Sequence, residues 1–232
     1  MSKSKQPISF GEQMMRFYDS ISFPKENLLS GMEVLYPYAD KKAREYARAF
    51  YDAFYADTLE RTFVFGINPG RLGSGATGVP FTDPIALEEY CGIPNTLPKR
   101  HEPTSRFIYD VIESMGGTDK FYHSFFLTAV CPLGFVRSGK NFNYYDDKGF
   151  LSRIDPFLIE TIRQQIACGA NREYAIVLGI GNNLKVFEKI NRELGLFRSV
   201  KALPHPRYIL QYQRKHLGEH IKKYQKVLRD DR

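Results

Sequence analysis

The clearest candidate for chemistry is Asn68, which follows an apolar run in the stretch FVFGINPGRLGSGATGVPF (residues 63–81). An asparagine cannot act as a general base, but its side-chain oxygen can accept a hydrogen bond from water while its amide donates elsewhere. Such a water can be placed in line with a carbon that is departing as a cation. Bare backbone at Gly70 lets a flat ligand approach, and Phe81 offers it a stacking face. Taken singly, Asn68 could instead satisfy its own turn, and Phe81 could belong to the core.

The glycines also invite comparison with nucleotide-binding loops. Residues 70–77 have the spacing GxxxxG after a strand, but Ala76 replaces the lysine of a phosphate loop, and Pro80 argues against a helix directly behind it. A second glycine pair, at residues 179–181, lacks the third glycine of the dinucleotide fingerprint, because Leu184 stands in its place. A nucleotide hydrolase is therefore the last of the alternatives, and we interpret residues 179–181 as a tight turn.

Hydrophobic periodicity and cap residues predict strands that alternate with helices. The expected strands are 62–67, 124–130, 174–179 and 199–203, and the expected helices are 10–21, 41–55, 104–115 (capped by Thr104 or Ser105), 155–166, 182–194 and 212–228. Such alternation is typical of a parallel sheet that is covered on both faces. We therefore expect one domain over residues 1–232, an α/β fold in the form of a three-layer α/β/α sandwich with a central four-stranded, mainly parallel sheet.

Three segments with unusual chemistry leave the ends of predicted strands. They are INPGRLGSGATGVPF, CPLGFVRSGKNFN and LPHPRYI. Ligands of open α/β sheets bind beyond the carboxyl ends of the strands. We therefore expect the three segments to converge on one site.

These three segments carry a resemblance to a known family. GINPG followed by TGVPF, with thirteen positions from Asn68 to Phe81, resembles the first motif of the single-strand-selective monofunctional uracil-DNA glycosylases. CPLGFVRSGKN (residues 131–141) is similar to that family's CPL…SGKN segment, and LPHPR (residues 203–207) resembles its terminal His-Pro motif. The resemblance runs from about residue 34 to residue 207 and implies the uracil-DNA glycosylase fold.

Other branches of that superfamily match less well. The mismatch-specific branch shares the GINPG start but has Asn-Pro where this chain has His205-Pro206. The branch with an iron–sulfur cluster is disfavoured because the three cysteines, Cys91, Cys131 and Cys168, fall short of the four that an ordinary cluster needs. We expect no metal and no organic cofactor.

The resemblance implies a role for each motif residue. Asn68 would position the hydrolytic water, Phe81 would stack on the uracil, and the backbone of Ile67 and Phe81 would contact its carbonyls. Asn141 would read the uracil edge, with its amide donating to O4 and its oxygen accepting from N3–H. His205 would lie near O2, where negative charge grows as the base leaves.

Two further positions concern the C5 substituent of the base. Gly70 lies where the family leaves room for it, and Ser74 stands where the family commonly has a methionine beside the pocket. The resemblance thus implies excision of uracil, with C5-modified uracil as a further substrate, by hydrolysis of the N-glycosidic bond. The target base would be flipped out of the stack. An abasic site would be left uncut, because the Asn68 loop contains no lysine and no other lysine is marked as an amine nucleophile.

DNA is the expected partner. The family's HPSPR motif and its basic wedge are shortened here to His205-Pro206-Arg207-Tyr208, which favours single strands over duplex, and Lys140 and Arg207 are the candidate phosphate contacts. A net charge of +7 and a pI near 9.2 suit a polyanionic partner. The basic tail could follow the phosphates or form an ordinary solvated helix face. Its charges are Arg214, Lys215, Lys222, Lys223, Lys226 and Arg229.

The composition limits the cellular compartment that we expect and leaves alternative functions open. The cysteines are odd in number and widely spaced, which suits a reducing compartment, and no apolar run is long enough for a membrane span. We expect a soluble, intracellular monomer, cytoplasmic in a bacterium and nuclear in a eukaryote. The rival interpretations are a glycosylase for another deaminated base, such as xanthine or hypoxanthine, and a non-catalytic nucleic-acid binder.

Overall fold

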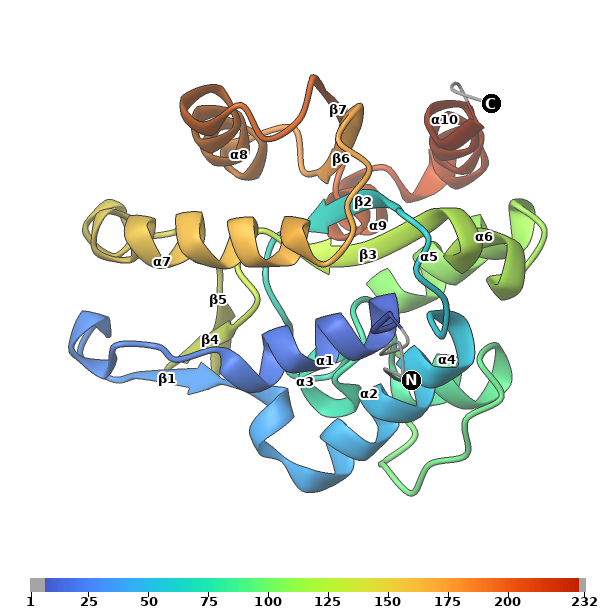
Figure 1. Ribbon diagram of the computed structural model, residues 1–232, viewed down its shortest axis with the longest axis horizontal. Helices are drawn as coiled ribbons and strands as arrows, with labels where there is room; N and C mark the ends of the chain where they lie inside the picture. Colours follow the sequence, from blue (N-terminus) through green and yellow to red (C-terminus); the bar gives the residue numbers. More distant parts are fainter. Residues whose placement is uncertain (1–6, 230–232) are drawn as a thin grey trace, which may run out of the picture.

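The computed structural model describes residues 7–229, so the two ends of the predicted domain, 1–6 and 230–232, lie outside the described part. At its centre is a four-stranded sheet in the order β3-β2-β6-β7, in which all neighbouring strands are parallel (Figure 1). Its strands are β2 (Thr62–Gly66), β3 (Phe125–Ala129), β6 (Tyr174–Leu178) and β7 (Ser199–Leu203). The predicted α/β fold around a four-stranded sheet is confirmed, with every pairing parallel.

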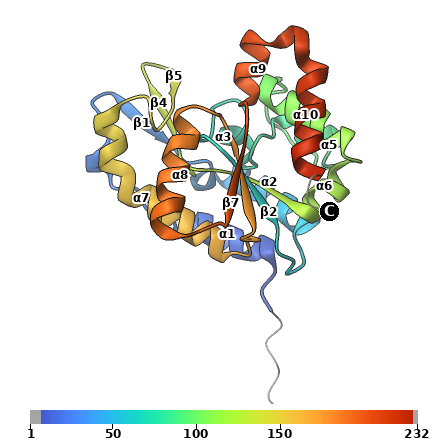
Figure 2. The ribbon, with the colours of Figure 1, turned by 90° about the horizontal axis from the view of Figure 1, so that it is seen from above.

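Helices cover both faces of this sheet. Figure 2 shows α7 and α8 on one side of the strands, and α5, α6, α9 and α10 on the other. The helices are α1 (Phe10–Ser20), α2 (Lys41–Phe54), α3 (Ser74–Thr77), α4 (Pro84–Glu89), α5 (Pro103–Ser114), α6 (Thr118–Ser124), α7 (Lys148–Ala167), α8 (Asn182–Leu194), α9 (Pro206–Tyr212) and α10 (Leu217–Arg229). This two-sided cover explains why the central strands are almost continuously apolar.

The core packs aromatic rings against the central strand. Phe63 and Phe65 project from one face of β2, since residues two apart in a strand share a face. The ring of Phe63 meets Phe10 of α1 at 6.0 Å between centroids, and the ring of Phe65 meets Phe187 of α8 at 4.7 Å. All five residues of β2 are buried, which gives the loop that follows a rigid base.

Two helices begin earlier than the sequence predicted. Helix α7 begins at Lys148, with Asp147 as its N-cap, and contains Pro156 in its interior, so the start assigned to Asp155 was wrong. Helix α5 is capped by Glu102, whose side chain accepts from Ser105 N, and not by Thr104 or Ser105. In α5 the proline, Pro103, is the first helical residue, so the residue before it becomes the cap.

The helix predicted over residues 212–228 begins later, at Leu217, and a second helix that was not predicted precedes it. Helix α9 begins directly after His205 and ends at Tyr212, and α10 begins at Leu217 after the short 3-10 turn Arg214–His216. The side chain of His205 caps α9 by accepting from Arg207 N. The His-Pro motif is therefore the start of a helix.

A second, smaller sheet was not predicted. It joins β1 (Met32–Leu35), β4 (Gly134–Arg137) and β5 (Lys140–Phe142) in antiparallel order β1-β4-β5. The β4–β5 hairpin turns at Ser138 and Gly139, whose φ angles are 50° and 71°. Two residues with positive φ suit the tight hairpin turn. The segment that was expected to be a loop after β3 is thus a hairpin that carries Asn141 on its second strand.

In residues 7–229, none of the helices is long and apolar enough to cross a membrane. The same part of the chain holds no group of three or more His, Cys, Asp or Glu side chains that could bind a metal ion.

Candidate active site

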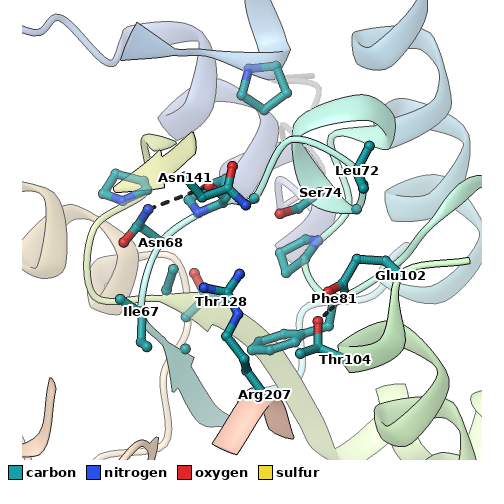
Figure 3. Close-up of a pocket in the computed structure, with 18 of the residues that line it drawn as sticks. Ile67, Asn68, Leu72, Ser74, Phe81, Glu102, Thr104, Thr128, Asn141 and Arg207 are labelled. Carbon is teal, nitrogen blue, oxygen red and sulfur yellow. Dashed lines mark hydrogen bonds between the residues drawn. The ribbon is translucent and has the colours of Figure 1, made fainter. Parts of the chain in front are cut away.

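A cavity of about 220 Å³ opens where the segments after β2, β3 and β7 meet the β4–β5 hairpin. Of the predicted site residues, it is lined by Ile67, Asn68, Gly70, Ser74, Phe81, Asn141, His205 and Arg207. Figure 3 shows Ile67, Asn68 and Asn141 on one side, with Ser74, Phe81 and Glu102 facing them and Arg207 reaching in between. Segments far apart in the sequence are therefore brought to one site. Lys140 is outside the lining and lies exposed on β5, next to Asn141.

The amide of Asn68 is held in one orientation by the chain that leaves β5. Its Nδ2 donates to the carbonyl of Phe142 at 3.3 Å, and its Oδ1 accepts from the backbone N–H of Tyr144 at 3.4 Å. An amide oxygen has two lone pairs and an NH₂ group has two protons. Nδ2 also donates to the carbonyl of Pro69 at 3.5 Å, so one lone pair on Oδ1 is left for a water or ligand in the cavity, and these backbone partners fix which way the amide points.

The ring of Phe81 lies against the backbone of Gly66, the last residue of β2. A Cβ at Gly66 would be only 2.6 Å from Cζ of Phe81 and 3.3 Å from the carbonyl oxygen of Thr128, so a side chain there would displace the ring. Phe81 itself has a φ of 56°, an uncommon backbone conformation for a non-glycine residue. Ring and strand end together form one wall of the cavity.

Hydrogen bonds from two threonines hold Phe81 in that conformation. Thr77 Oγ1 donates to the carbonyl of Thr82 at 2.7 Å, and Thr82 Oγ1 is 3.0 Å from the hydroxyl of Tyr109. At Gly78, where φ is 72°, a Cβ would lie 2.9 Å from the carbonyl oxygen of Ala43. The TGVPFT segment is thus fixed by buried polar contacts on both sides of the ring.

Asn141 approaches the glycine loop from the hairpin. Its Oδ1 accepts from the backbone N–H of Arg71 at 3.3 Å, and a Cβ at Gly70 would lie 3.3 Å from its Nδ2. The loop can therefore come close to Asn141 because residue 70 is a glycine. One lone pair of Oδ1 and the Nδ2 donors are left for a ligand.

His205 is a neutral hydrogen-bond donor at this site. Burial and, to a smaller extent, the nearby Arg207 guanidinium lower the pKa of its imidazole from 6.5 to about 3. Its Nδ1 accepts from Arg207 N at 3.2 Å, and a neutral imidazole that accepts at Nδ1 carries its proton on Nε2. The ring lies 6.0 Å from the ring of Phe81 between centroids. The cavity thus has a fixed Nε2–H donor beside its aromatic wall.

Sequence reasoning missed residues that hold the cavity-lining segments in place. Asn183, buried at the start of α8, donates from Nδ2 to the carbonyls of Gly66 at 3.2 Å and Leu178 at 2.9 Å. Its Oδ1 accepts from the hydroxyl of Tyr144 at 2.8 Å. Asn183 thereby joins the ends of β2 and β6 to the segment that orients Asn68. The only signal in the sequence is an asparagine just after the glycine turn at residues 179–181.

Glu102 was also missed and lines the cavity at the N-terminus of α5. Its carboxylate accepts from Ser105 N at 2.9 Å and from the hydroxyl of Thr104. The signal that could have revealed it is an acidic residue before Pro103, which is a common cap-and-proline pair. Its helix-capping bonds account for its presence at the site.

Comparisons with known proteins agree with this geometry. Residues 53–229 match the profile of the uracil DNA glycosylase superfamily, which covers more than half of the chain. The crystal structure of wild-type SMUG2 from Pedobacter heparinus is similar, with a TM-score of 0.90 and 36% sequence identity, over 94% of this chain and 96% of that one. No curated protein sequence matches the chain.

The sheet order, the cavity beyond the strand ends and these two comparisons lead to the same assignment. The chain belongs to the uracil-DNA glycosylase superfamily, within its SMUG family, and is a uracil-DNA glycosylase, a hydrolase of DNA repair whose substrate is DNA.

Proposed function

We propose that uracil is bound and released in the cavity between Asn68 and His205. The observation that carries this assignment is the pairing of a backbone-oriented amide at Asn68 with a neutral Nε2–H donor at His205 in one cavity. Phe81 stacks on the flipped base, and the backbone of Ile67 and Phe81 contacts its carbonyls. An apolar wall with a few convergent polar groups is typical of ligand sites.

The reaction breaks the bond between C1′ and uracil N1, whose electron pair leaves with the base. The sugar becomes an oxocarbenium ion, and the water held by Asn68 adds to C1′ and loses a proton to solvent. Because the carbon is already cationic, the water needs orientation and not a strong base. His205 donates to uracil O2 as negative charge grows there, and loss of one such donor typically costs about 10²–10³ in rate.

Asn141 selects uracil over cytosine. Its Nδ2 donates to O4 and its remaining lone pair on Oδ1 accepts from N3–H, whereas cytosine presents an amino group and an unprotonated N3 to the same atoms. The glycine at residue 70 and the small side chain of Ser74 leave room beside the base, so a C5 substituent on uracil is accommodated. A purine product of deamination, such as xanthine or hypoxanthine, is the rival substrate.

The enzyme leaves an abasic site uncut. No lysine is among the described residues that line the cavity, and burial raises the pKa of Cys131, next to the lining residue Pro132, to about 12. A neutral thiol is a poor nucleophile, so neither a lysine amine nor a cysteine thiol forms a covalent intermediate with the sugar. Water is then the acceptor of the sugar.

Single-stranded DNA is the preferred form of the substrate. Extruding a base costs a few kcal/mol and costs least where it is unpaired. The chain after His205 continues directly into α9, so the segment that would enter a duplex is short. Lys140 and Arg207 contact the phosphates on either side of the flipped nucleotide.

The test is single-turnover release of uracil from an oligonucleotide with one uracil, as a single strand and in duplex opposite guanine. We expect faster release from the single strand, a product that is intact until alkali treatment, and no adduct on borohydride reduction. A trapped adduct would disprove the hydrolytic route. Faster release from the duplex would disprove the strand preference.

The phosphate contacts have a charge-matched control. Lys140→Ala with Arg207→Ala should weaken binding to the strand and make it less sensitive to salt, because fewer counterions are released. Arg153→Ala with Arg163→Ala removes the same charge from α7, which contributes no residue to the cavity. Equal affinities for the two double variants would refute the contacts.

A further inference from the structure

Helix α9 displays an aromatic pair to solvent. Tyr208 is 46% exposed and Tyr212 is 64% exposed, which makes Tyr212 the most exposed large hydrophobic residue in the described part of the chain. They are four residues apart, the spacing that places two side chains on one helix face. Their rings contact each other at 5.4 Å between centroids with an interplanar angle of 46°. Burial in the core therefore does not explain either ring.

This pair directly adjoins the cavity. Tyr208 follows Arg207, which lines the cavity, and His205 caps the same helix. At about 1.5 Å of rise per residue, Tyr212 is only about 7–8 Å further along the axis than Arg207. The pair thus lies on the helix that begins at the cavity, within two turns of the residue that lines it.

Positive charge lies on both sides of the pair. The exposed Arg207 precedes Tyr208, and the exposed Arg214 and Lys215 follow Tyr212 in the 3-10 turn. Proteins that hold single-stranded nucleic acid combine such charges, which contact phosphates, with aromatic rings on which bases stack. An isolated apolar patch would lack the charges, and a solvated basic face would lack the rings.

We infer that Tyr208 and Tyr212 form a stacking platform for a nucleobase adjacent to the flipped uracil in the same DNA strand. This inference rests on the proposed function of the cavity, since the platform matters only if uracil enters there. The occupant is an unpaired base, because both faces of a paired base are already covered by stacking in a duplex. The platform thereby gives single strands an affinity that the cavity alone does not provide.

The experiment is a double-mutant cycle in which changes in the protein are combined with changes in the DNA strand. The probe is a single-stranded oligonucleotide with one 2′-fluoroarabino-uridine, which resists hydrolysis because the fluorine destabilises the oxocarbenium ion. Its 5′ or 3′ neighbour is either thymine or an abasic spacer. Binding is measured for the wild type, for Tyr208→Ala with Tyr212→Ala, and for Tyr208→Phe with Tyr212→Phe.

For the wild type, we expect the spacer on one side to weaken binding by about five- to a hundredfold, the range that stacking of one base gives. The double alanine variant should bind the thymine strand as weakly as the wild type binds the spacer strand, and the spacer should cost it nothing more. The double phenylalanine variant keeps both rings and should behave as the wild type does.

A spacer penalty that persists in the double alanine variant would overturn the platform, as would unchanged affinity of that variant for the thymine strand. The platform would also be overturned if the double alanine variant bound duplex DNA more weakly than the wild type does but bound single strands equally well. That result would indicate that the tyrosines form a wedge that enters the duplex. Thermal unfolding of the variants checks folding, and exposed positions should leave it nearly unchanged. Absence of uracil release by the wild type would refute the proposed function instead, so the two failures are distinguishable.

Discussion

The hydroxyl of Tyr144 donates a hydrogen bond of 2.8 Å to Oδ1 of Asn183, which binds the end of the central sheet. The same tyrosine uses its backbone N–H to hold Oδ1 of Asn68 at 3.4 Å. One residue thus links the buried frame of the fold to the amide that we assign to the water. Positioning of Asn68 should therefore depend on a side chain that never touches the substrate.

Tyr144→Phe tests this link, because it removes only the hydroxyl. The buried acceptor on Asn183 loses its partner, which typically costs about 1–3 kcal/mol of unfolding free energy. We expect the rate constant for uracil release at saturating enzyme to fall about tenfold while affinity for the strand is unchanged. Tyr145→Phe, at the half-buried neighbour, is the control. If Tyr144→Phe loses stability but keeps the full rate, Tyr144 has only a structural role.

Gly66→Ala should damage the stacking wall. The new Cβ would overlap the ring of Phe81, which must then move towards the space that we assign to the base. We expect uracil release to fall about a hundredfold with a weaker affinity for the uracil strand. Gly218→Ala in α10, where a Cβ would meet no atom within 4 Å, is the matched control and should leave release unchanged. Equal activities of the two variants would contradict the placement of Phe81.

Asn141→Asp should alter base selection. A protonated aspartic acid can donate to cytosine N3 and its carbonyl can accept from the amino group, whereas an ionised one repels uracil O4. We expect uracil release to fall by at least about a hundredfold and cytosine release to become measurable. Asn141→Ala should lower uracil release without any gain on cytosine. Full uracil activity of Asn141→Asp, without cytosine release, would show that another residue reads this edge.

The pH dependence of release should reflect the lowered pKa of His205. Since burial and Arg207 lower it from 6.5 to about 3, the donor form persists from about pH 8 down to about pH 4. Uracil release should therefore show no acid limb near 6.5, and the contribution of neutral His205 to stability should be lost only as pH falls from 6.5 through 3. A limb near 6.5 that disappears in His205→Gln would contradict a neutral histidine.

Much of the fold could be predicted from local sequence patterns. The limits of α8 and β7 were predicted residue for residue, and the end of α8 is marked clearly by the glycine that follows it, Gly195. The start of α7 was wrong because Pro156 imitates a first helical position while lying inside the helix. The tail was divided at residues 213–216, where charged residues give no periodic signal against which a break could be recognised.

The site was predictable where motif residues leave strand ends, as for Asn68, Phe81 and His205, which share one cavity. Gly66 and Asn183 were missed because their importance depends on what packs against them. Gly66 meets Phe81 across 15 positions in the chain, and Asn183 meets Gly66 across 117. No local spacing encodes such long-range contacts, and only the parallel order of β2 and β6 brings them together.

The most direct test of the account is single-turnover release of uracil from a single strand by the wild type, Asn68→Ala and His205→Ala at equal enzyme excess. We expect release by the wild type, with a loss of about 10²–10³ in rate for His205→Ala and a loss at least as large for Asn68→Ala. Both variants should still bind the strand, because the loss lies in the transition state. Wild-type rates in either variant would contradict the assignment of the water to Asn68 or of the leaving base to His205.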